Sequence, residues 1–311
     1  MPLTLAEAEK YSRTTLLRGV IEEILKVSPV LNVLPFAEVL GNSLTYNREA
    51  TLPGADWYSP GDTWVESTPT VTPVTVVLKI LGGDADIDNF LKATRSNEQD
   101  IEAAILLEKA KAVAYEFEDC FIYGKAASLA NQWDGLHTLI GSGAQQVNMG
   151  TTTTGAAGTL SALDQLIDLV KPGKPDLLIM SRRSRRGIQK LARAQGLALA
   201  TTTLGMLGRP VLSYGDIPIA VSDFISDVET IATSRYALKI GGACSSIFAI
   251  KCGEGSLMGI EGPSGIAAEL VGALETKDAT RWRVKWYNAI ALLCTLAIAR
   301  MDGITSADWT N

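Results

Sequence analysis

A long extended arm that folds back on itself, within residues 42–80, constrains this chain more than any other feature. The outgoing limb, SLTYNREAT, and the returning limb, TVTPVTVVLKI, are both rich in residues that favour strands. The span between the limbs carries four turn-forming residues, Pro53, Gly54, Pro60 and Gly61. Together these patterns predict a β-hairpin with a long tip.

The tip of this hairpin holds Trp57, Tyr58 and Trp64, in a chain of which only 6% is aromatic. Exposed aromatic clusters are adhesive, so such a tip either folds back onto its own body or docks on a neighbouring molecule. We favour the neighbour. The sequence then describes a protein whose function is to assemble with copies of itself.

The composition bounds the remaining possibilities. A chain of 311 residues with 47% hydrophobic content can bury a sizeable core, in one large or two moderate domains. Its net charge of −6 argues against avid nucleic-acid binding by the chain as a whole, so that any DNA contact is local. No apolar run reaches the ~18 residues of a membrane span, and the N-terminus lacks a signal-peptide pattern. We expect synthesis in the cytoplasm.

The sequence carries no catalytic signature. It lacks GxSxG, GxGxxG and the P-loop patterns GxxxxGKS and GxxxxGKT. Its four cysteines are scattered, and the single histidine, His137, lies between turn residues, where we expect it at the surface or at the edge of the core. We predict that the protein is not an enzyme and has no catalytic residue, cofactor or metal, and that His137→Ala leaves function intact.

Asp84, Asp86 and Asp88 have the alternate spacing of the first half of a calcium loop. The pattern then fails, because Asn89 stands where the loop requires glycine and Arg95 stands where it requires a bidentate glutamate. We therefore expect these aspartates in a solvated turn between a strand and a helix.

An amphipathic helix is predicted over residues 4–27, with Leu17, Ile21 and Ile24 in its apolar stripe. The proline-punctuated residues 29–41 follow it and are expected to drape over a surface as an arm.

The clearest helix of the sequence spans residues 97–123. Val113, Phe117 and Phe121 belong to its apolar face, while charged residues such as Glu118 are expected to be solvated. A helix of this length runs roughly 40 Å, which suits the bracing of a flat subunit.

A Thr-rich linker at residues 150–159 is the best candidate for a boundary between substructures, and an α/β layout follows it. We predict a helix over 160–170, a buried strand over 176–180 and a helix over 182–195. Two strands then form a hairpin over Gly215 and Asp216, with Pro218 placing the second strand at a sheet edge. The remaining apolar segments are predicted to be strands.

The densest basic run of the chain lies at the start of the helix predicted over 182–195. It comprises Arg182, Arg183, Arg185 and Arg186, followed by Lys190 and Arg193. On a helix these side chains spread over more than half of the circumference, which favours a solvated face with intersubunit salt bridges. Contact with phosphate or with an acidic partner is the alternative.

The order of these parts resembles the major capsid protein of tailed bacteriophages, which has the Hong Kong 97-type fold. The stretches SPVLNVLPFAEVLGNSLTYNRE, GRPVLSYGDIPIAVSDFI, TSRYAL and AIARMDGI resemble a family of compact phage coat proteins. The resemblance covers nearly all 311 residues.

The resemblance implies an α+β fold in four parts. These are an N-terminal arm (1–41), an E-loop hairpin (42–83), a peripheral domain with the long spine helix (84–149 and 262–288) and an axial α/β domain (150–261 and 289–311).

The resemblance also implies a structural coat protein that forms pentamers and hexamers of an icosahedral shell around double-stranded DNA. Its location would be the virion, after assembly in the host cytoplasm, with no membrane involved. Its partners would be copies of itself, a portal, weakly bound DNA and, as a further candidate, a decoration protein. A separate scaffolding protein is also expected, because the sequence begins at Met1, almost directly at the arm helix. The candidate intersubunit contacts are Trp57, Tyr58, Trp64, Arg48, Glu49, Leu17, Ile21 and Ile24.

Two other classes remain open at this point. An encapsulin-like nanocompartment would share the fold but enclose protein cargo in place of a genome. A soluble α/β enzyme would be a monomer or a small oligomer with a closed pocket.

Overall fold

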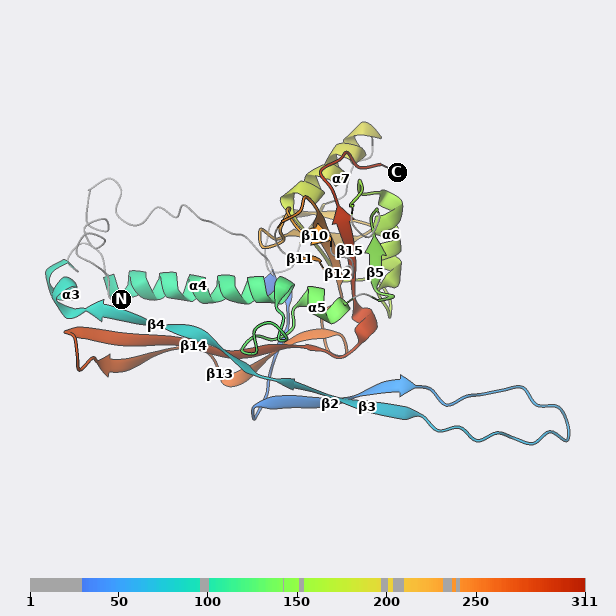
Figure 1. Ribbon diagram of the computed structural model, residues 1–311, viewed down its shortest axis with the longest axis horizontal. Helices are drawn as coiled ribbons and strands as arrows, with labels where there is room; N and C mark the ends of the chain where they lie inside the picture. Colours follow the sequence, from blue (N-terminus) through green and yellow to red (C-terminus); the bar gives the residue numbers. More distant parts are fainter. Residues whose placement is uncertain are drawn as a thin grey trace.

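The computed structural model describes residues 30–95, 101–141, 143–150, 154–196, 201–203, 210–231, 237–238 and 241–310 (Figure 1). The helix predicted over 4–27, and with it Leu17, Ile21 and Ile24, lies outside these residues. Among the described residues, no helix is both long enough and apolar enough to cross a membrane.

A four-stranded sheet lies along the long helix α4 (Ile101–Tyr123), as Figure 1 shows. Its strands run in the order β1 (Phe36–Glu38), β13 (Leu257–Ala273), β14 (Ala279–Leu292) and β4 (Lys79–Asp88). Phe117 and Phe121 of α4 are fully buried, and the Phe117 ring lies 4.7 Å from the ring of Trp286 on β14. The apolar face predicted for the long helix therefore packs on this sheet.

The second sheet of the molecule has seven strands. Its order is β5 (Gln146–Asn148), β15 (Ile298–Ile304), β12 (Ser245–Ile250), β6 (Leu177–Met180), β9 (Ile217–Val221), β8 (Pro210–Tyr214) and β7 (Thr201–Thr203). Every residue of β6, β12 and β15 is buried, in agreement with the wholly apolar sequence of β6. β15 is buried although it contains Arg300 and Asp302.

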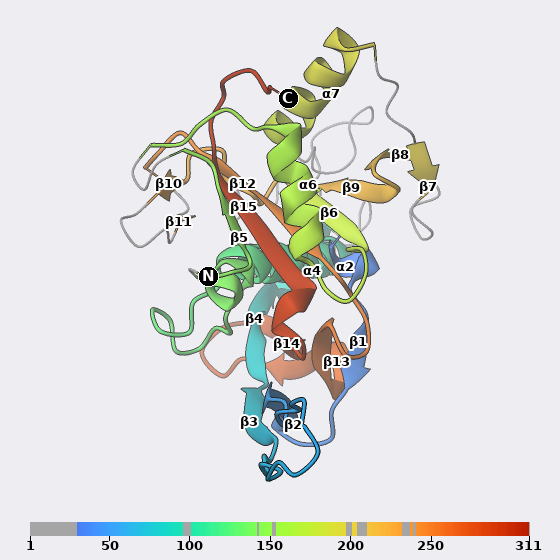
Figure 2. The same ribbon diagram turned by 90° about the vertical axis from the view of Figure 1, so that its right-hand side faces the viewer.

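Two hydrophobic cores cover the two faces of the seven-stranded sheet. Figure 2 shows this sheet with helices on both of its faces. One face packs on α4, on α5 (Leu136–Ile140) and on the four-stranded sheet. The other face packs on α6 (Leu160–Leu169) and α7 (Arg182–Ala194). The shorter elements are α2 (Val30–Val33), α3 (Asn89–Arg95), β10 (Thr230–Ile231), β11 (Ala237–Leu238) and the 3-10 helix Thr295–Ala297.

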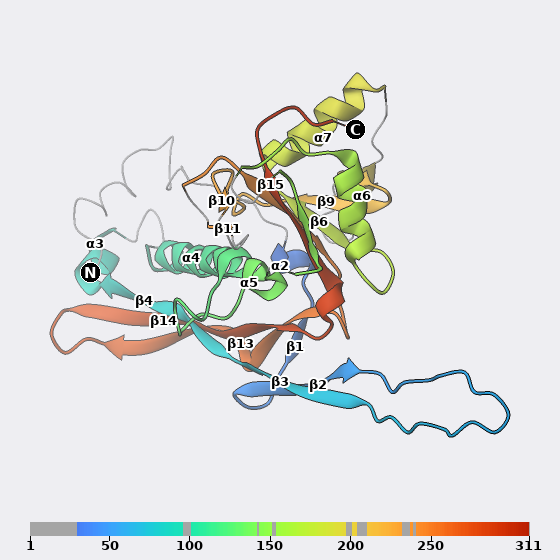
Figure 3. The same cartoon turned by 45° about the vertical axis from the view of Figure 1, so that its right-hand side comes forward.

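The hairpin at residues 43–77 stands apart from both sheets. Its strands β2 (Ser43–Thr51) and β3 (Thr70–Val77) are antiparallel and paired from Ser43 with Val77 to Thr51 with Thr70. The hairpin lies on the side of the four-stranded sheet that is turned away from α4, and its tip projects well beyond the body (Figures 1 and 3). The outgoing strand has the predicted bounds, whereas the returning strand ends at Val77, before the predicted end at Ile80, and Ile80 belongs to β4.

Most elements predicted after residue 159 are confirmed. The helices α6 and α7 and the buried strand β6 lie within one to two residues of the predicted bounds. The hairpin between β8 and β9 turns at Gly215 and Asp216, both with positive φ, as a two-residue turn of this type requires.

The edge position predicted for the strand at 217–221 is wrong. β9 lies between β8 and β6 in the interior of the sheet. Its ladder with β6 begins at Ile219, so the missing N–H of Pro218 falls before the ladder and removes no bond from it.

The solvated turn predicted around Asp84 and Asp86 is also wrong. Residues 79–88 form β4, which pairs with β14 throughout, and Asp88 alone lies at the junction with α3, where its Oδ1 accepts from the N–H of Phe90 at 2.8 Å. The aspartates are tolerated in this strand because Arg281 and Arg283 of β14 form ion pairs with Asp86 and Asp84 across the strands.

Two expectations about the N-terminal half need correction. Residues 30–38 do not simply drape over a surface, because they contribute α2 and the edge strand β1, which runs parallel to β13. Glu118 of α4 is not solvated. It is 3% exposed, and its carboxylate accepts from the N–H of Leu31 at 3.4 Å.

Candidate intersubunit surfaces and a buried polar cluster

The tip of the hairpin exposes its aromatic side chains. Trp57 is 99% exposed and Trp64 is 78% exposed. Tyr58 stacks on Trp64 with 4.4 Å between the ring centroids, and its hydroxyl accepts from the N–H of Val65 at 3.1 Å. The tip is thus held together by its own residues and does not pack on its own body, which leaves docking on a neighbour as the prediction that fits its exposure.

The base of the hairpin is fixed to the end of β14. The Tyr46 hydroxyl donates to the carbonyl of Leu292 at 2.6 Å, and Arg48 Nε donates to the carbonyl of Leu293 at 3.2 Å. Arg48, a predicted intersubunit contact, is therefore half-buried against its own chain, whereas Glu49 is exposed. The base anchors the hairpin, and the tip is left free to contact another molecule.

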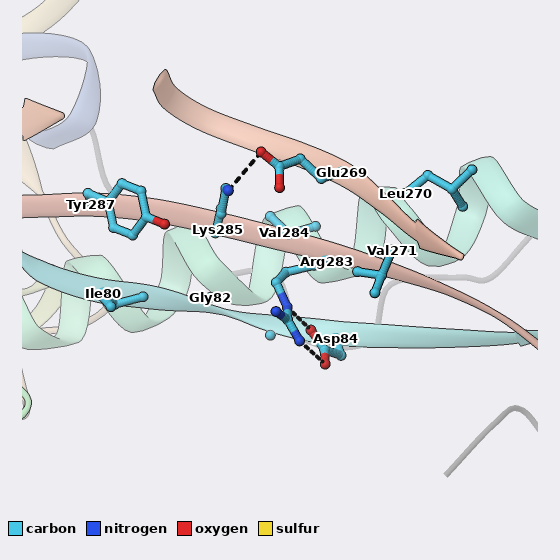
Figure 4. A pocket seen from close by; sticks show the side chains of 11 residues that line it. Ile80, Gly82, Asp84, Glu269, Leu270, Val271, Arg283, Val284, Lys285 and Tyr287 are labelled. Carbon is cyan, nitrogen blue, oxygen red and sulfur yellow. Dashed lines mark hydrogen bonds and ion pairs between the residues drawn. The ribbon is translucent and has the colours of Figure 1, made fainter. Parts of the chain in front are cut away.

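A groove of about 760 Å³ crosses the face of the four-stranded sheet that is turned away from α4 (Figure 4). Arg283 holds Asp84 through two hydrogen bonds of 2.7 and 2.9 Å, and Lys285 pairs with Glu269 at 2.7 Å. The hydrogen bond from Arg283 lowers the pKa of Asp84 below its ordinary value. These charges are thus balanced within the groove.

Apolar side chains lie around the same ion pairs. Ile80, Leu270 and Val271 all line the groove and are between 54% and 76% exposed. Exposed apolar residues next to paired charges are typical of a surface that is covered by a partner. No sequence pattern singled out this surface, although the alternation of charged and apolar residues along KILGGDADID and WRVKWY carries the signal.

The first two residues of the basic run on α7 are engaged within their own chain. Arg182 forms two hydrogen bonds of 2.5 Å with Asp223, and Arg183 donates to the carbonyls of Ala243 and Ile304 and lies 3.4 Å from Asp227. Arg182 and Arg183 thus have acidic partners in their own chain, in the loop that follows β9. The intersubunit salt bridges expected for this face stay a prediction.

His137 is fully buried, so its expected place at the surface or core edge is wrong. Its Nδ1 lies 2.6 Å from Nη1 of Arg300, and its Nε2 lies 3.3 Å from the carboxylate of Glu229. The Ser246 hydroxyl donates to the same carboxylate at 2.6 Å, as does the hydroxyl of Tyr123. The cluster joins α4, α5, β12, β15 and the segment before β10.

The electrostatics of this cluster indicate a structural role. Because an arginine can only donate, Nδ1 of His137 accepts from Arg300, and Nε2 carries the proton that faces Glu229. Desolvation lowers the pKa of His137, which keeps the ring neutral. Sequence reasoning missed Arg300 and Asp302, whose signal was the presence of two charges inside the apolar stretch AIARMDGI.

Nothing in the described part of the chain forms a metal site, since no group of three or more His, Cys, Asp or Glu residues could hold an ion there. The four cysteines are free. Burial raises the pKa of the thiols of Cys120 and Cys252 to about 12, so neither is a reactive thiolate near neutral pH.

No protein-family model and no curated protein sequence matches this chain. Solved structures do match it. The SrpI encapsulin of Synechococcus elongatus PCC 7942 has a TM-score of 0.73 and 16% identity over 100% of this chain and 99% of its own. The capsid of a native GTA particle has a TM-score of 0.66 and 18% identity, with coverage of 97% and 100%. This chain has the Hong Kong 97-type capsid fold.

The Hong Kong 97-type fold extends over the whole chain. Microbacterium phage Oxtober96 supplies a further match, with a TM-score of 0.64 at 13% identity over 98% of this chain and 99% of its own. The α+β class predicted from the resemblance is confirmed. Identities this low define the fold alone.

Proposed function

We propose that this chain is the subunit of a closed protein shell: a major capsid protein that assembles into pentamers and hexamers around double-stranded DNA. The observation that carries the proposal is the hairpin tip, where Trp57 and Trp64 are almost fully exposed on an arm that reaches beyond the body. Such a tip is adhesive in solution but stable once a neighbouring copy covers it.

In this account the hairpin is the E-loop and α4 is the spine helix. The peripheral domain comprises 84–149 and 262–288, and the axial domain comprises 150–261 and 289–311. The two sheets support this division, because the first lies along α4 and the second lies between α4 and the pair α6 and α7. β5 pairs with β15 and thus crosses the proposed boundary at residue 149.

The groove beside Asp84 is the surface that we assign to the neighbour's tip. The hairpin and the groove lie on the same side of the four-stranded sheet, so a copy placed beside the first can lay its tip on that face (Figures 1 and 4). The contact joins two different patches, and a head-to-tail contact of this kind closes into rings when the rotation fits. Pentamers and hexamers are such rings.

The role is structural and not enzymatic. The fold neighbours named capsid and encapsulin support it, as does the engagement of His137 in a buried cluster with Arg300 and Glu229. We assign no catalytic residue and no cofactor. The proposed location is the virion, with a scaffolding protein, a portal and a decoration protein as candidate partners.

Electron microscopy of the purified protein tests this proposal. We expect closed icosahedral particles, and a mass in the megadalton range by light scattering. A monomer or small oligomer under all assembly conditions would contradict the proposal and favour a soluble enzyme.

An encapsulin-like compartment is the second candidate, and the match to SrpI over 100% of this chain favours it. The two candidates differ in what the shell encloses, which is DNA in a capsid and protein in a compartment. Particles isolated from the producing cell and treated with nuclease are expected to retain DNA if the shell is a capsid. Particles that retain a protein cargo and no DNA would favour the compartment.

A further inference from the structure

A basic cleft of about 300 Å³ lies between α7 and the C-terminal residues 305–309. Its lining includes four cations, Arg183, Arg186, Lys190 and Arg193, and one carboxylate, that of Asp308. The four cations follow one another at intervals of three, four and three residues, which places them on one stripe of the helix. The full run of six cations was expected to spread over more than half of the helix circumference, whereas these four share one side of it.

The wall opposite α7 is fixed in place. Trp309 is 7% exposed and lies against Gly187 and Gly158, where an added Cβ would come within 3.0 Å of its ring. The N–H of Thr310 donates to the carbonyl of Gly158 at 3.0 Å. Because the segment is anchored on both sides, the cleft exists before any ligand enters, which reduces the ordering cost of binding.

Two of the four cations lack an acidic partner. Arg183 lies 3.4 Å from Asp227, and Lys190 pairs with Asp308 at 2.6 Å. Arg186 and Arg193 are exposed and form no ion pair with any described residue. The pair between Lys190 and Asp308 is itself largely exposed, so an incoming anion can replace Asp308 at little cost.

We infer that this cleft binds the phosphate groups of a nucleic-acid backbone. An arginine fork and a hydroxyl can donate to one phosphate together, and the hydroxyls of Thr305 and Ser306 line the cleft beside the guanidinium groups. Arg186 and Arg193 are about 10 Å apart along the helix axis, which spans more than one nucleotide of a strand. With the Trp309 ring buried, no stacking surface is offered to bases, so the contact is independent of sequence.

This inference depends on the proposed shell only for the identity of the nucleic acid, which would be the enclosed DNA. A protein that is acidic overall gains a local contact with its enclosed genome at α7, without the avid binding that its net charge of −6 opposes. Binding is therefore measured on the unassembled full-length chain, so that failure to bind DNA and failure to assemble are separate results.

The experiment is fluorescence anisotropy with a labelled duplex of about 20 base pairs, at salt concentrations from about 50 to 200 mM. Arg186→Ala with Arg193→Ala is expected to weaken binding about tenfold and to reduce the salt slope by about 2. The control is Arg182→Ala with Lys174→Ala, which removes two charges whose side chains pair with Asp223 and Asp216 outside the cleft. The control is expected to bind within about twofold of wild type.

A second variant separates loss of binding from loss of structure. Asp308→Asn removes the competing carboxylate and is expected to tighten binding about threefold, which misfolding cannot do. Equal losses in the two double variants would overturn the inference. So would competition by poly-glutamate at the potency of unlabelled duplex, which assigns the cleft to an acidic peptide, or displacement of DNA by inorganic phosphate at low millimolar concentration, which assigns it to a free ion.

Discussion

At the scale of the residue, His137 lies where two helices and the seven-stranded sheet meet, and its two ring nitrogens face Arg300 and Glu229. Because His137 is buried, we no longer expect His137→Ala to be tolerated. His137→Ala would leave both charged partners without the imidazole and create a cavity. We expect a loss of about 2 to 4 kcal/mol in the free energy of unfolding, measured with urea. A loss below about 0.5 kcal/mol would show that the cluster contributes nothing to stability.

The same residue predicts a pH dependence. The pKa of His137 is lowered in the folded state, so below the ordinary histidine pKa the unfolded chain binds a proton at this residue that the folded chain does not bind. The stability that this adds is fully present above the ordinary histidine pKa of about 6.5 and is lost progressively as pH falls below it.

His137→Asn is the matched test, because asparagine does not titrate. Between about pH 6.5 and 5.5 the wild type should lose up to about 1 kcal/mol more than the variant. Parallel losses in the two proteins would contradict a titrating role for His137.

At the scale of the element, Gly187→Ala in α7 is expected to change the stability of the protein in the opposite direction to the usual effect of this substitution in a helix. Replacing a glycine inside a helix by alanine ordinarily stabilises by about 0.5 to 1 kcal/mol. Here the new Cβ would collide with the ring of Trp309, so Gly187→Ala is expected to destabilise by about 1 to 3 kcal/mol in thermal unfolding.

The control for Gly187→Ala is the same change in a Trp309→Ala background, where the obstacle is gone. There it should be neutral or stabilising. Destabilisation of equal size in both backgrounds would mean that the helix itself, and not the contact with Trp309, rejects the alanine.

Elements with a local signal could be predicted from the sequence. The two limbs of the hairpin, the end of α4 at Tyr123, and the turn at Gly215 and Asp216 all follow from strand propensity, periodicity or turn chemistry. β4 was missed because its GGDAD stretch has the composition of a turn, and only pairing with Arg281 and Arg283, about 195 residues away, makes it a strand.

The surfaces were harder to predict than the elements. The aromatic tip was recognisable because three large rings stand among turn residues. The groove, the α7 cleft and the His137 cluster each combine residues from distant segments, so no local pattern defines them. The role of residues 1–27 stays a prediction: their deletion is expected to leave a folded subunit that assembles poorly, as circular dichroism and sedimentation would show.

At the scale of the whole molecule, the chain consists of a packed body and a projecting hairpin. The body buries two cores, one on each face of the seven-stranded sheet. The hairpin packs against the first core only near its base, through Leu44, Tyr46 and Val76, and its tip is exposed except at the half-buried Tyr58. Different residues therefore stabilise the subunit and the assembly, so a mutation can weaken assembly without lowering the stability of the subunit.

The most direct measurement is sedimentation velocity of Trp57→Ala with Trp64→Ala beside the wild type, combined with thermal unfolding. Each tryptophan is expected to contribute on the order of 1 to 3 kcal/mol to the contact with a neighbour. We expect near-normal unfolding of the subunit but few or unstable particles. The control Leu129→Ala changes an exposed side chain outside the hairpin and is expected to assemble as wild type. A double variant that forms normal particles from a destabilised subunit would contradict the central claim.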